Sequence, residues 1–341
     1  MIRRLTCLAL AVIAAVALAA CGEKNEPAST APATEQVRLM LDFFPNADHA
    51  GIYAALGTGE FRKAGLDVAI QAPTDPSSPL KLLAAGRVDL AISYEPELLL
   101  ARDRGERLVA VGAIVTKPLT SIISIGKNAV SDPGQLRGKT VGTAGIPYQS
   151  AYLKTILDRA AVPPSSVKEV NVGFNLVPAM LSKKVDATLG AFWNYEGIQL
   201  RQKRKRPKVI RMEKVGVPTY DELILVAREQ DLQKGGAKVR RFIHALARGT
   251  EALKRNQDLG VNPLMQANPD LDRKLQEASV RATLPVFFPA KPSQPYGWMD
   301  PMEWAAYGRW MYENKLLNSP PNTAAAVTNE FLPGQGPTSG S

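Results

Sequence analysis

From Val37 onward, short apolar runs rich in β-branched residues alternate with stretches that place apolar residues at helical spacing. The apolar runs predict strands over residues 37–41, 66–71, 89–93, 109–115, 122–125, 140–142, 167–172, 187–190 and 223–227. The stretches between them predict helices over residues 50–64, 79–85, 96–104, 149–160, 176–182 and 195–203. This alternation predicts an α/β fold with mainly parallel sheets that are covered by helices on both faces.

After Ala227 the pattern becomes mostly helical. One stretch places apolar residues on a single face, which we expect to pack on a core: Val239, Phe242, Ile243, Leu246 and Leu253. His244 lies beside this face, so we expect it to be structural. Trp304, Tyr307 and Met311 also fall at helical spacing, which favours core packing over ligand contact.

Two segments of the chain resemble each other. Residues 80–94 and 180–192 both contain an apolar helix end, a basic residue, a Val-Asp pair and then a short strand. Each strand runs into a segment of polar and aromatic residues, at 93–97 and 193–196. Open α/β sheets bind ligands beyond the carboxyl ends of their strands. The similarity of the two segments therefore predicts two similar lobes that face each other across a cleft and close by a hinge motion.

The first 20 residues follow the pattern of a secretory signal peptide, with a basic start and an apolar run that ends in small residues. Residues 18–21, Leu-Ala-Ala-Cys, resemble a bacterial lipobox. The resemblance implies cleavage before Cys21 and lipid on its thiol and amino group, and more than one acyl chain gives lasting anchorage. Residues 21–36 are polar and lack periodicity, so we expect a lipidated Cys21 followed by a flexible tether.

Composition narrows the classes of function. The 341 residues, 45% hydrophobic and 22% charged, indicate a folded chain of about two domains. The two cysteines, Cys7 and Cys21, exclude a disulfide framework and a Cys-rich metal site, and two histidines argue against an all-histidine site. We therefore expect neither a metal nor a cofactor.

The formal net charge is +10, and removal of the signal with Arg3 and Arg4 lowers it to +8. Six of the eight residues from Arg201 to Lys208 are basic. We interpret this run as a solvated helix end followed by a turn at Pro207. It lacks the interleaved aromatic residues of a nucleic-acid motif, so no nucleic-acid partner is expected.

The sequence contains none of the common catalytic motifs that we sought. Gly-x-Ser-x-Gly and His-Glu-x-x-His are absent, and no Gly-x-Gly-x-x-Gly follows the first strand. Residues 134–140 resemble a phosphate loop, but three residues separate the glycines where four are needed, and a strand follows. Glu95 and Glu97 flank Pro96, which suits the first turn of a helix better than an acid–base pair. No catalytic residue is predicted.

Polar and aromatic residues collect where the predicted strands end. Ten of them are candidates for ligand binding: Asp42, Phe43, His49, Tyr94, Tyr148, Trp193, Asn194, Glu196, Tyr220 and Glu222. Aromatic rings with carboxylates and amides suit a planar, nitrogen-rich heterocycle, because rings stack on rings and acids accept hydrogen bonds from amino groups. A sulfonate fits poorly, since no arginine falls within these turns.

Two of these assignments stay open on the residues alone. Phe43 and its neighbour Phe44 are either core residues or stacking surfaces. His49 either contacts ligand or braces the first turn after the strand. Asn46 and Asp48 are expected to cap the helix that follows.

Several separated motifs carry a resemblance to a known family: LDFFPNADHAGIYAA at 41–55, the segment 65–102, GAFWNYEGIQL at 190–200 and GVPTYDELILVA at 216–227. Over roughly residues 37–317 the chain resembles the solute-binding components of bacterial ABC importers for thiamine-precursor pyrimidines. The resemblance implies a two-lobed periplasmic-binding-protein-like fold of type II, with mixed, largely parallel sheets joined by two hinge segments. We expect lobe 1 at 37–117 and 223–332, lobe 2 at 118–222, and a flexible tail at 333–341.

The resemblance also implies a function. The ligand is expected to be a formylated or hydroxymethylated 4-amino-2-methylpyrimidine, with Phe43 and Trp193 stacking on it and Asp42, Asn194 and Glu196 recognising its polar groups. The partners are expected to be an ABC permease with its ATPase and the lipid membrane outside the cytoplasm, and the protein a monomer. Related binding proteins take riboflavin or sulfonates such as taurine, which remain alternatives.

A fungal pyrimidine synthase is related to these binding proteins. It shares the Pro-Thr-x-Pro-Ser turn at 73–77 and the Gly-x-Val-Asp sequence that leads from a helix into a strand. That enzyme uses a lysine that binds pyridoxal phosphate, a histidine and a cysteine-rich iron site. At the corresponding positions this chain has Ser93 and Glu97, and no cysteine near 217–222. The departure argues against synthase activity and in favour of a passive receptor.

Overall fold

The structure is a computed structural model that describes residues 34–127, 129–234 and 236–336. The predicted signal peptide, the lipidation at Cys21, most of the tether and the end of the tail lie outside these residues. No helix within the described residues combines the length and the apolar character needed to cross a membrane.

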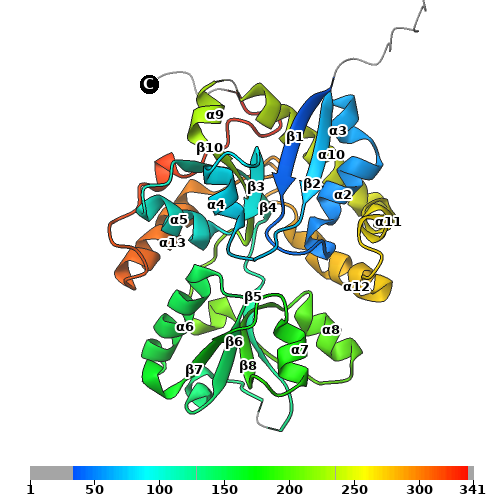
Figure 1. The fold of residues 1–341 in the computed structure, drawn as a ribbon. Helices are drawn as coiled ribbons and strands as arrows, with labels where there is room; N and C mark the ends of the chain where they lie inside the picture. The colour runs from blue at the N-terminus through cyan, green and yellow to red at the C-terminus, as the bar shows by residue number, and fades with distance from the viewer. Residues whose placement is uncertain (1–33, 128, 235, 337–341) are drawn as a thin grey trace, which may run out of the picture. The chain divides into compact units, whose positions relative to one another are not determined.

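The described residues form two five-stranded sheets, and each lies in its own lobe (Figure 1). The first sheet has the order β2-β1-β3-β10-β4 and contains β1 (Glu35–Met40), β2 (Leu66–Gln71), β3 (Leu90–Ser93), β4 (Leu108–Val115) and β10 (Leu223–Arg228). The second has the order β7-β6-β8-β5-β9 and contains β5 (Thr120–Ser124), β6 (Thr140–Thr143), β7 (Lys168–Asn171), β8 (Ala187–Phe192) and β9 (Lys208–Arg211). The strands of the two sheets have the same arrangement, as the similarity of residues 80–94 and 180–192 predicted.

Each sheet is mixed and largely parallel. β1 runs parallel to β2 and β3, and β6 runs parallel to β7 and β8. The antiparallel exceptions are β10, between β3 and β4, and β5, between β8 and β9. Both exceptions are the strands that follow a crossing between the lobes: the chain enters the second sheet through β5 and returns to the first through β10. The predicted fold class is confirmed.

Helices flank both sheets. In the first lobe they are α2 (Ala50–Gly57), α3 (Glu60–Lys63), α4 (Pro79–Ala84), α5 (Glu95–Asp103), α9 (Glu229–Gln233), α10 (Ala237–Arg255), α11 (Asp258–Ala267), α12 (Arg273–Thr283) and α13 (Pro301–Glu313). In the second they are α6 (Pro147–Arg159), α7 (Leu176–Leu181) and α8 (Glu196–Gln202). Short 3₁₀ turns complete the chain, namely η1 (Ala47–His49), η2 (Pro133–Leu136), η3 (Pro164–Ser166), η4 (Met212–Val215), η5 (Leu284–Val286) and η6 (Thr323–Ala325).

The predicted core residues of the C-terminal region are buried. The apolar face of α10 and the side chains of Trp304, Tyr307 and Met311 on α13 all lie inside the first lobe. The apolar stripe of α10 packs against α2 and α3, where the ring of Phe242 stacks on that of Phe61 at 4.8 Å between centroids. The helical spacing therefore predicted correctly which side chains form this core.

Two predictions about elements were wrong. The helix expected over 50–64 is two helices, because Gly59 has a φ of 72°, a left-handed conformation that ends α2 and starts α3. The second is a missed strand: the edge strand β9 begins at Lys208, directly after the predicted turn at Pro207. Its four residues include one buried side chain, Ile210, so its hydrophobic pattern is too short to identify it. The helix end before it is solvated as predicted, and residues 201–206 are exposed.

Candidate functional site

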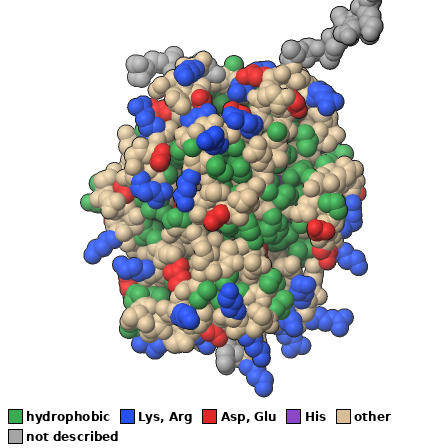
Figure 2. Space-filling view, viewed as in Figure 1, with side chains coloured by type: hydrophobic (Ala, Val, Ile, Leu, Met, Phe, Trp, Pro, Cys, Tyr) green, Lys and Arg blue, Asp and Glu red, His purple; other side chains and the backbone are tan. Residues whose placement is uncertain are grey.

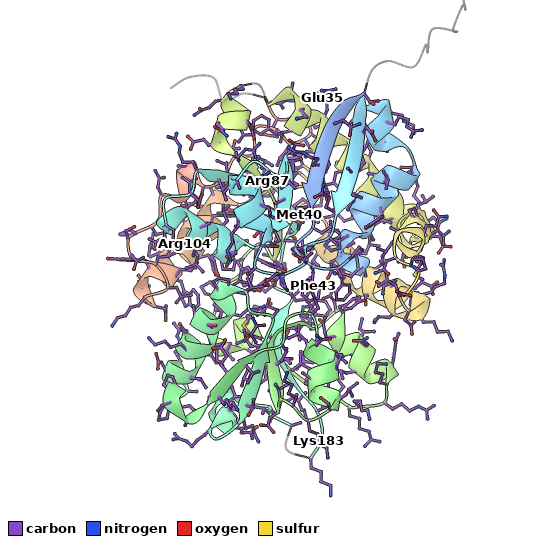
Figure 3. All side chains as sticks on the ribbon, viewed as in Figure 1. Glu35, Met40, Phe43, Arg87, Arg104 and Lys183 are labelled. Atoms are coloured by element: carbon purple, nitrogen blue, oxygen red, sulfur yellow. The ribbon has the colours of Figure 1, made fainter. Side chains whose placement is uncertain are left out.

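A cavity lies between the lobes, where loops and helix ends beyond the strands of both sheets meet. It borders about 360 Å³ of atom-free space and is lined by Asp42, Phe43, Asn46, Asp48, Tyr94, Ala144, Ile146, Gln149, Leu176, Gly190, Phe192, Tyr195 and Glu196. Figure 3 shows Phe43 at the junction of the two lobes, far from Lys183 at the distal end of the second lobe. A smaller hollow, which borders about 220 Å³ of atom-free space including open solvent, adjoins it, because Asp42, Tyr94 and Ile146 line both.

Asp42 is held from two sides by buried groups. The Tyr94 hydroxyl donates to its Oδ2 at 2.6 Å. His49 Nδ1 accepts from the backbone N–H of Asn46 at 3.2 Å, so the neutral ring carries its proton on Nε2, which lies 2.8 Å from Asp42 Oδ1. His49 is completely buried and does not line the cavity. The geometry thus places His49 behind the lining, where its ring orients Asp42.

Aromatic rings from both lobes meet at the cavity wall. The Phe43 ring lies 4.7 Å from Phe44 and 4.6 Å, edge-on, from Phe174 of the second lobe. Phe44 also approaches Tyr195 of the second lobe at 6.2 Å. Phe43 is half-buried and lines the cavity. Its ring therefore packs against the second lobe and also presents a surface on which a ligand can stack.

Besides the Tyr195 ring, the second lobe supplies a carboxyl and an amide side chain to the cavity. Glu196 opens α8, its Oε2 accepts from the backbone N–H of Phe192 at 2.7 Å, and burial raises its pKa to about 7. Gln149 lies near the start of α6, and its Oε1 accepts from the backbone N–H of Ala144 at 2.7 Å. A Cβ at Gly190 would lie 2.3 Å from Gln149 Nε2. Gly190 also has a φ of 105°, so both the space and the backbone at this position require glycine.

A hydrogen-bonded group joins the lobes beside the cavity. Asn194 Nδ2, in the second lobe, donates to Asp48 Oδ1 and to Thr283 Oγ1, each at 2.6 Å. Asp48 lies on η1 and Thr283 ends α12, so both belong to the first lobe. All three side chains are buried, and burial raises the pKa of Asp48 to about 6.

The two crossings between the lobes are tied together by Glu222. Its Oε2 accepts from the backbone N–H groups of Leu119 and Thr120 at 2.6 and 2.8 Å and from the Tyr220 hydroxyl at 3.0 Å. Its Oε1 accepts from Thr120 Oγ1 at 2.8 Å, and burial raises its pKa to about 7. The Tyr148 hydroxyl lies 3.2 Å from Thr120 Oγ1. These contacts place Tyr148, Tyr220 and Glu222 at the crossings, outside the cavity lining.

Trp193 lies away from the cavity. Its indole Nε1 donates to the Pro118 carbonyl at 3.1 Å, and the Arg211 guanidinium lies 4.1 Å from the ring centre. Phe192 is the last residue of β8 and lines the cavity, whereas Trp193 begins the turn that follows and is not part of the lining. The structure therefore does not bring Trp193 together with Phe43.

Four of the ten residues predicted for ligand binding line the cavity: Asp42, Phe43, Tyr94 and Glu196. His49 and Asn194 lie directly behind that lining. Sequence reasoning missed five polar or aromatic lining residues, namely Asn46, Asp48, Gln149, Phe192 and Tyr195. The sequence marks the segments that contain them, but for Asn46 and Asp48 it indicates only capping. Asn46 does cap η1, accepting from Asp48 N at 2.8 Å, and it also faces the cavity.

The cavity differs in charge from the surface. Lys and Arg side chains are spread over the face shown in Figure 2, whereas none of those that the structure describes lines the cavity. Within the described part of the chain, no three His, Cys, Asp or Glu side chains form a group that could hold a metal ion. The lining can therefore accept hydrogen bonds and stack against a ring, but it offers no cation to an anionic group.

Comparisons with known proteins agree with this geometry. The family model described as NMT1/THI5 like matches residues 46–259. The formylaminopyrimidine-binding protein of Halalkalibacterium halodurans is 33% identical over 313 residues, which cover 91% of this chain and 94% of that protein. A 4-amino-5-hydroxymethyl-2-methylpyrimidine phosphate synthase of Saccharomyces cerevisiae is 24% identical and covers 88% of both chains.

Solved structures share the fold at much lower identity. The alkanesulfonate-binding protein of Xanthomonas axonopodis pv. citri, solved with bound MOPS, superposes with a TM-score of 0.67 at 17% identity, covering 87% of this chain and 99% of that one. The fold is thus the two-lobed fold of periplasmic binding proteins. With the family model matched over more than half its length, the chain belongs to the NMT1/THI5-like family.

Proposed function

We propose that the protein is an extracytoplasmic receptor of an ABC importer, which captures a thiamine-precursor aminopyrimidine between its lobes and delivers it to a membrane permease. The observation that carries the proposal is the interlobe cavity, which among the described residues is lined by three carboxyl side chains and four aromatic rings and by no Lys or Arg. The name of the Halalkalibacterium relative supports the choice of a formylaminopyrimidine or its hydroxymethyl counterpart.

The chemistry of the lining supports this class of ligand. Asp42, Asp48 and Glu196 offer acceptors to exocyclic and ring N–H groups, and Phe43 offers a face for stacking. We assign ligand contact to Asp42, Phe43, Tyr94 and Glu196, and supporting roles to the other predicted residues. A sulfonate would meet carboxylates without a compensating cation, so the shared fold with sulfonate-binding proteins does not extend to their ligands.

The proposal excludes catalysis of the synthase type. The position that corresponds to the synthase lysine is Ser93, which is buried at the end of β3. The position of the histidine is Glu97, a buried carboxyl whose pKa is raised by burial. The cavity lining contains no lysine to form a Schiff base with pyridoxal phosphate. We therefore propose binding without turnover.

The predictions for the N-terminus complete the proposal. A signal at 1–20, lipid on Cys21 and a tether through residue 36 would hold the protein at the outer face of the cytoplasmic membrane, in the periplasm or on the cell surface. The lobes would span 37–117 with 223–332, and 118–222, followed by a flexible tail. We propose that the receptor acts as a monomer beside an ABC permease and its ATPase.

A ligand screen tests the function. The chain is freed of bound small molecules and its thermal unfolding is followed with 4-amino-5-hydroxymethyl-2-methylpyrimidine, its formylamino counterpart, thiamine, riboflavin and taurine. A ligand at 100 times its dissociation constant should stabilise the folded chain by about 2.7 kcal/mol. Stabilisation by riboflavin or taurine alone would retain a receptor but overturn the aminopyrimidine. Pyridoxal phosphate absorbance together with bound iron would favour an enzyme.

A further inference from the structure

One polar atom in the cavity lining stands apart from the others. Asp48 Oδ2 is buried and has no hydrogen-bond partner, and it is the one such side-chain atom among the described lining residues. Asp42, by contrast, has a buried donor on each oxygen, from His49 and from Tyr94. Glu196 has a backbone donor on Oε2. Among the buried polar atoms of the described lining, Asp48 Oδ2 is thus the acceptor that a ligand N–H would complete.

The other oxygen of the same carboxylate is engaged across the cleft. Asp48 Oδ1 accepts from Asn194 Nδ2 of the second lobe at 2.6 Å, with Thr283 Oγ1 at 3.1 Å on its other side. The orientation of the Asn194 amide follows from chemistry, since its nitrogen and not its oxygen must face a carboxylate. Opening of the lobes would remove Asn194 from Asp48, because the two residues lie on different lobes.

From this arrangement we propose that Asp48 couples recognition of an exocyclic amino group to closure of the lobes. Its Oδ2 accepts from the amino group of a planar heterocycle, while its Oδ1 binds Asn194. The inference rests on the proposed function and adds to it a specificity-determining residue that capping alone had appeared to explain. It concerns the exocyclic amino group and leaves the other ring substituents to other residues.

The free-energy cost of burying an unpaired oxygen explains why Asp48 couples ligand recognition to closure of the lobes. A buried carboxylate oxygen without a donor is costly, and hydrogen bonds to charged groups are stronger than those between neutral groups. Closure without a ligand donor satisfies Oδ1 but buries Oδ2 unpaired. A ligand that brings an N–H removes that cost, so it favours the closed form over the open one. A ligand without the donor gains nothing from Asp48 on closure.

The position of Asp48 is fixed by its neighbours before any ligand arrives. Its backbone N–H donates to the Asn46 side chain at 2.8 Å, and the next residue, His49, is locked between Asn46 and Asp42. The cap at Asn46 therefore aims the carboxylate at both the cavity and the opposite lobe. A preformed acceptor of this kind loses little conformational freedom on binding.

The test uses two rings that differ in one group: 4-amino-5-hydroxymethyl-2-methylpyrimidine and the same molecule without its 4-amino group. Their dissociation constants are measured by calorimetry for the unaltered chain, Asp48→Asn, Asn194→Ala and Asp67→Asn. Asp67 is an exposed carboxylate on β2 and serves as the control. Thermal unfolding of each variant verifies that it is folded.

Asp48→Asn should reduce the preference for the amino ring by about 10- to 100-fold, because the acceptor becomes an amide that presents an N–H or a weaker oxygen. Asn194→Ala should weaken both rings by a similar factor, because it removes the contact between the lobes and keeps the acceptor. Asp67→Asn should change neither value.

Distinct outcomes separate the two proposals. An unaltered preference in Asp48→Asn would overturn the role of Asp48 while the receptor stands, whereas failure of the unaltered chain to bind either ring would overturn both. Should Asp48→Asn not fold, Asn194→Ala still decides the coupling. Small-angle scattering of this variant without ligand should show a larger radius of gyration than the unaltered chain, and an unchanged radius would refute the proposed contact.

Discussion

At the scale of single residues, Phe43 and Trp193 are two aromatic side chains that follow strand ends: Phe43 comes shortly after β1, and Trp193 comes directly after β8. Phe43 lines the cavity, whereas Trp193 packs under Arg211 and donates to Pro118. Phe43→Ala should weaken binding of the aminopyrimidine by about tenfold or more, because the ligand loses a stacking surface. Trp193→Ala should leave affinity within about twofold and instead lower the unfolding temperature, because its contacts are internal to the protein.

The measurements are isothermal calorimetry for affinity and a thermal scan for stability, on the same preparations. Equal loss of affinity in both variants would contradict the assignment of Trp193 to structure, and equal retention would remove Phe43 from the site. Because Phe43 also contacts Phe174 between the lobes, its variant should lose some stability as well.

The candidate site could be predicted only in part, because the sequence does not show where individual side chains point. Sequence position shows that a residue follows a strand, which placed Asp42, Phe43, Tyr94 and Glu196 correctly near the cleft. It does not show the direction of the side chain in an irregular segment, which decides between Phe192 and Trp193. Nor does it show that one side chain performs two tasks, as Asn46 does when it caps η1 and faces the cavity.

At the scale of elements, the crossings between the lobes depend on the carboxylate of Glu222. It accepts from two backbone N–H groups at the start of β5 and from two hydroxyls. Glu222→Ala should lower the free energy of unfolding by about 3 kcal/mol or more, because several buried donors lose their acceptor. Glu222→Gln should cost much less, because its carbonyl oxygen can replace Oε2 and the Thr120 hydroxyl can turn to accept from the amide.

Urea unfolding of the two variants beside the unaltered chain measures this difference. A Gln variant as unstable as the Ala variant would show that the negative charge, and not the acceptor oxygen, is what the crossings require.

The elements themselves were largely predictable, because burial imposes the period of each on the sequence. Buried strands such as β4 are continuous apolar runs, and α10 repeats its apolar face over several turns. The failures occur where that signal is weak. Four residues of an edge strand, β9, carry one buried side chain, and a single glycine at position 59 breaks a helix without interrupting its hydrophobic pattern.

At the scale of the whole molecule, several buried carboxyl groups lie where the two lobes contact each other. Burial raises the pKa of Asp48 to about 6 and those of Glu196 and Glu222 to about 7, against ordinary values near 4. The folded chain therefore keeps protons between about pH 4 and pH 7 that the unfolded chain has released. Since the folded state binds more protons in this range, these groups make the protein less stable as the pH rises through it.

The buried carboxyl groups affect the pH dependence of stability only between about pH 4 and pH 7. Below about pH 4 both states are protonated at these groups, and above about pH 7 both are ionised, so their contribution to the slope vanishes. Surface carboxylates act in the opposite sense at low pH: Asp89 has a pKa lowered by its hydrogen bonds to Arg38, although its own burial opposes the shift. Stability should therefore rise as the pH falls from 7 to about 5 and decline again below about 4.

Thermal unfolding across pH 4 to 8 measures this profile, and Glu222→Gln isolates one contributor to it. That variant keeps an acceptor at the crossings but cannot titrate, so its loss of stability between pH 5 and pH 7 should be shallower than that of the unaltered chain. Parallel profiles for the two proteins would mean that Glu222 is ionised throughout, held so by its four donors despite burial. A profile that falls steadily from pH 7 to pH 5 would mean that the interlobe carboxylates as a group stay charged in the folded protein.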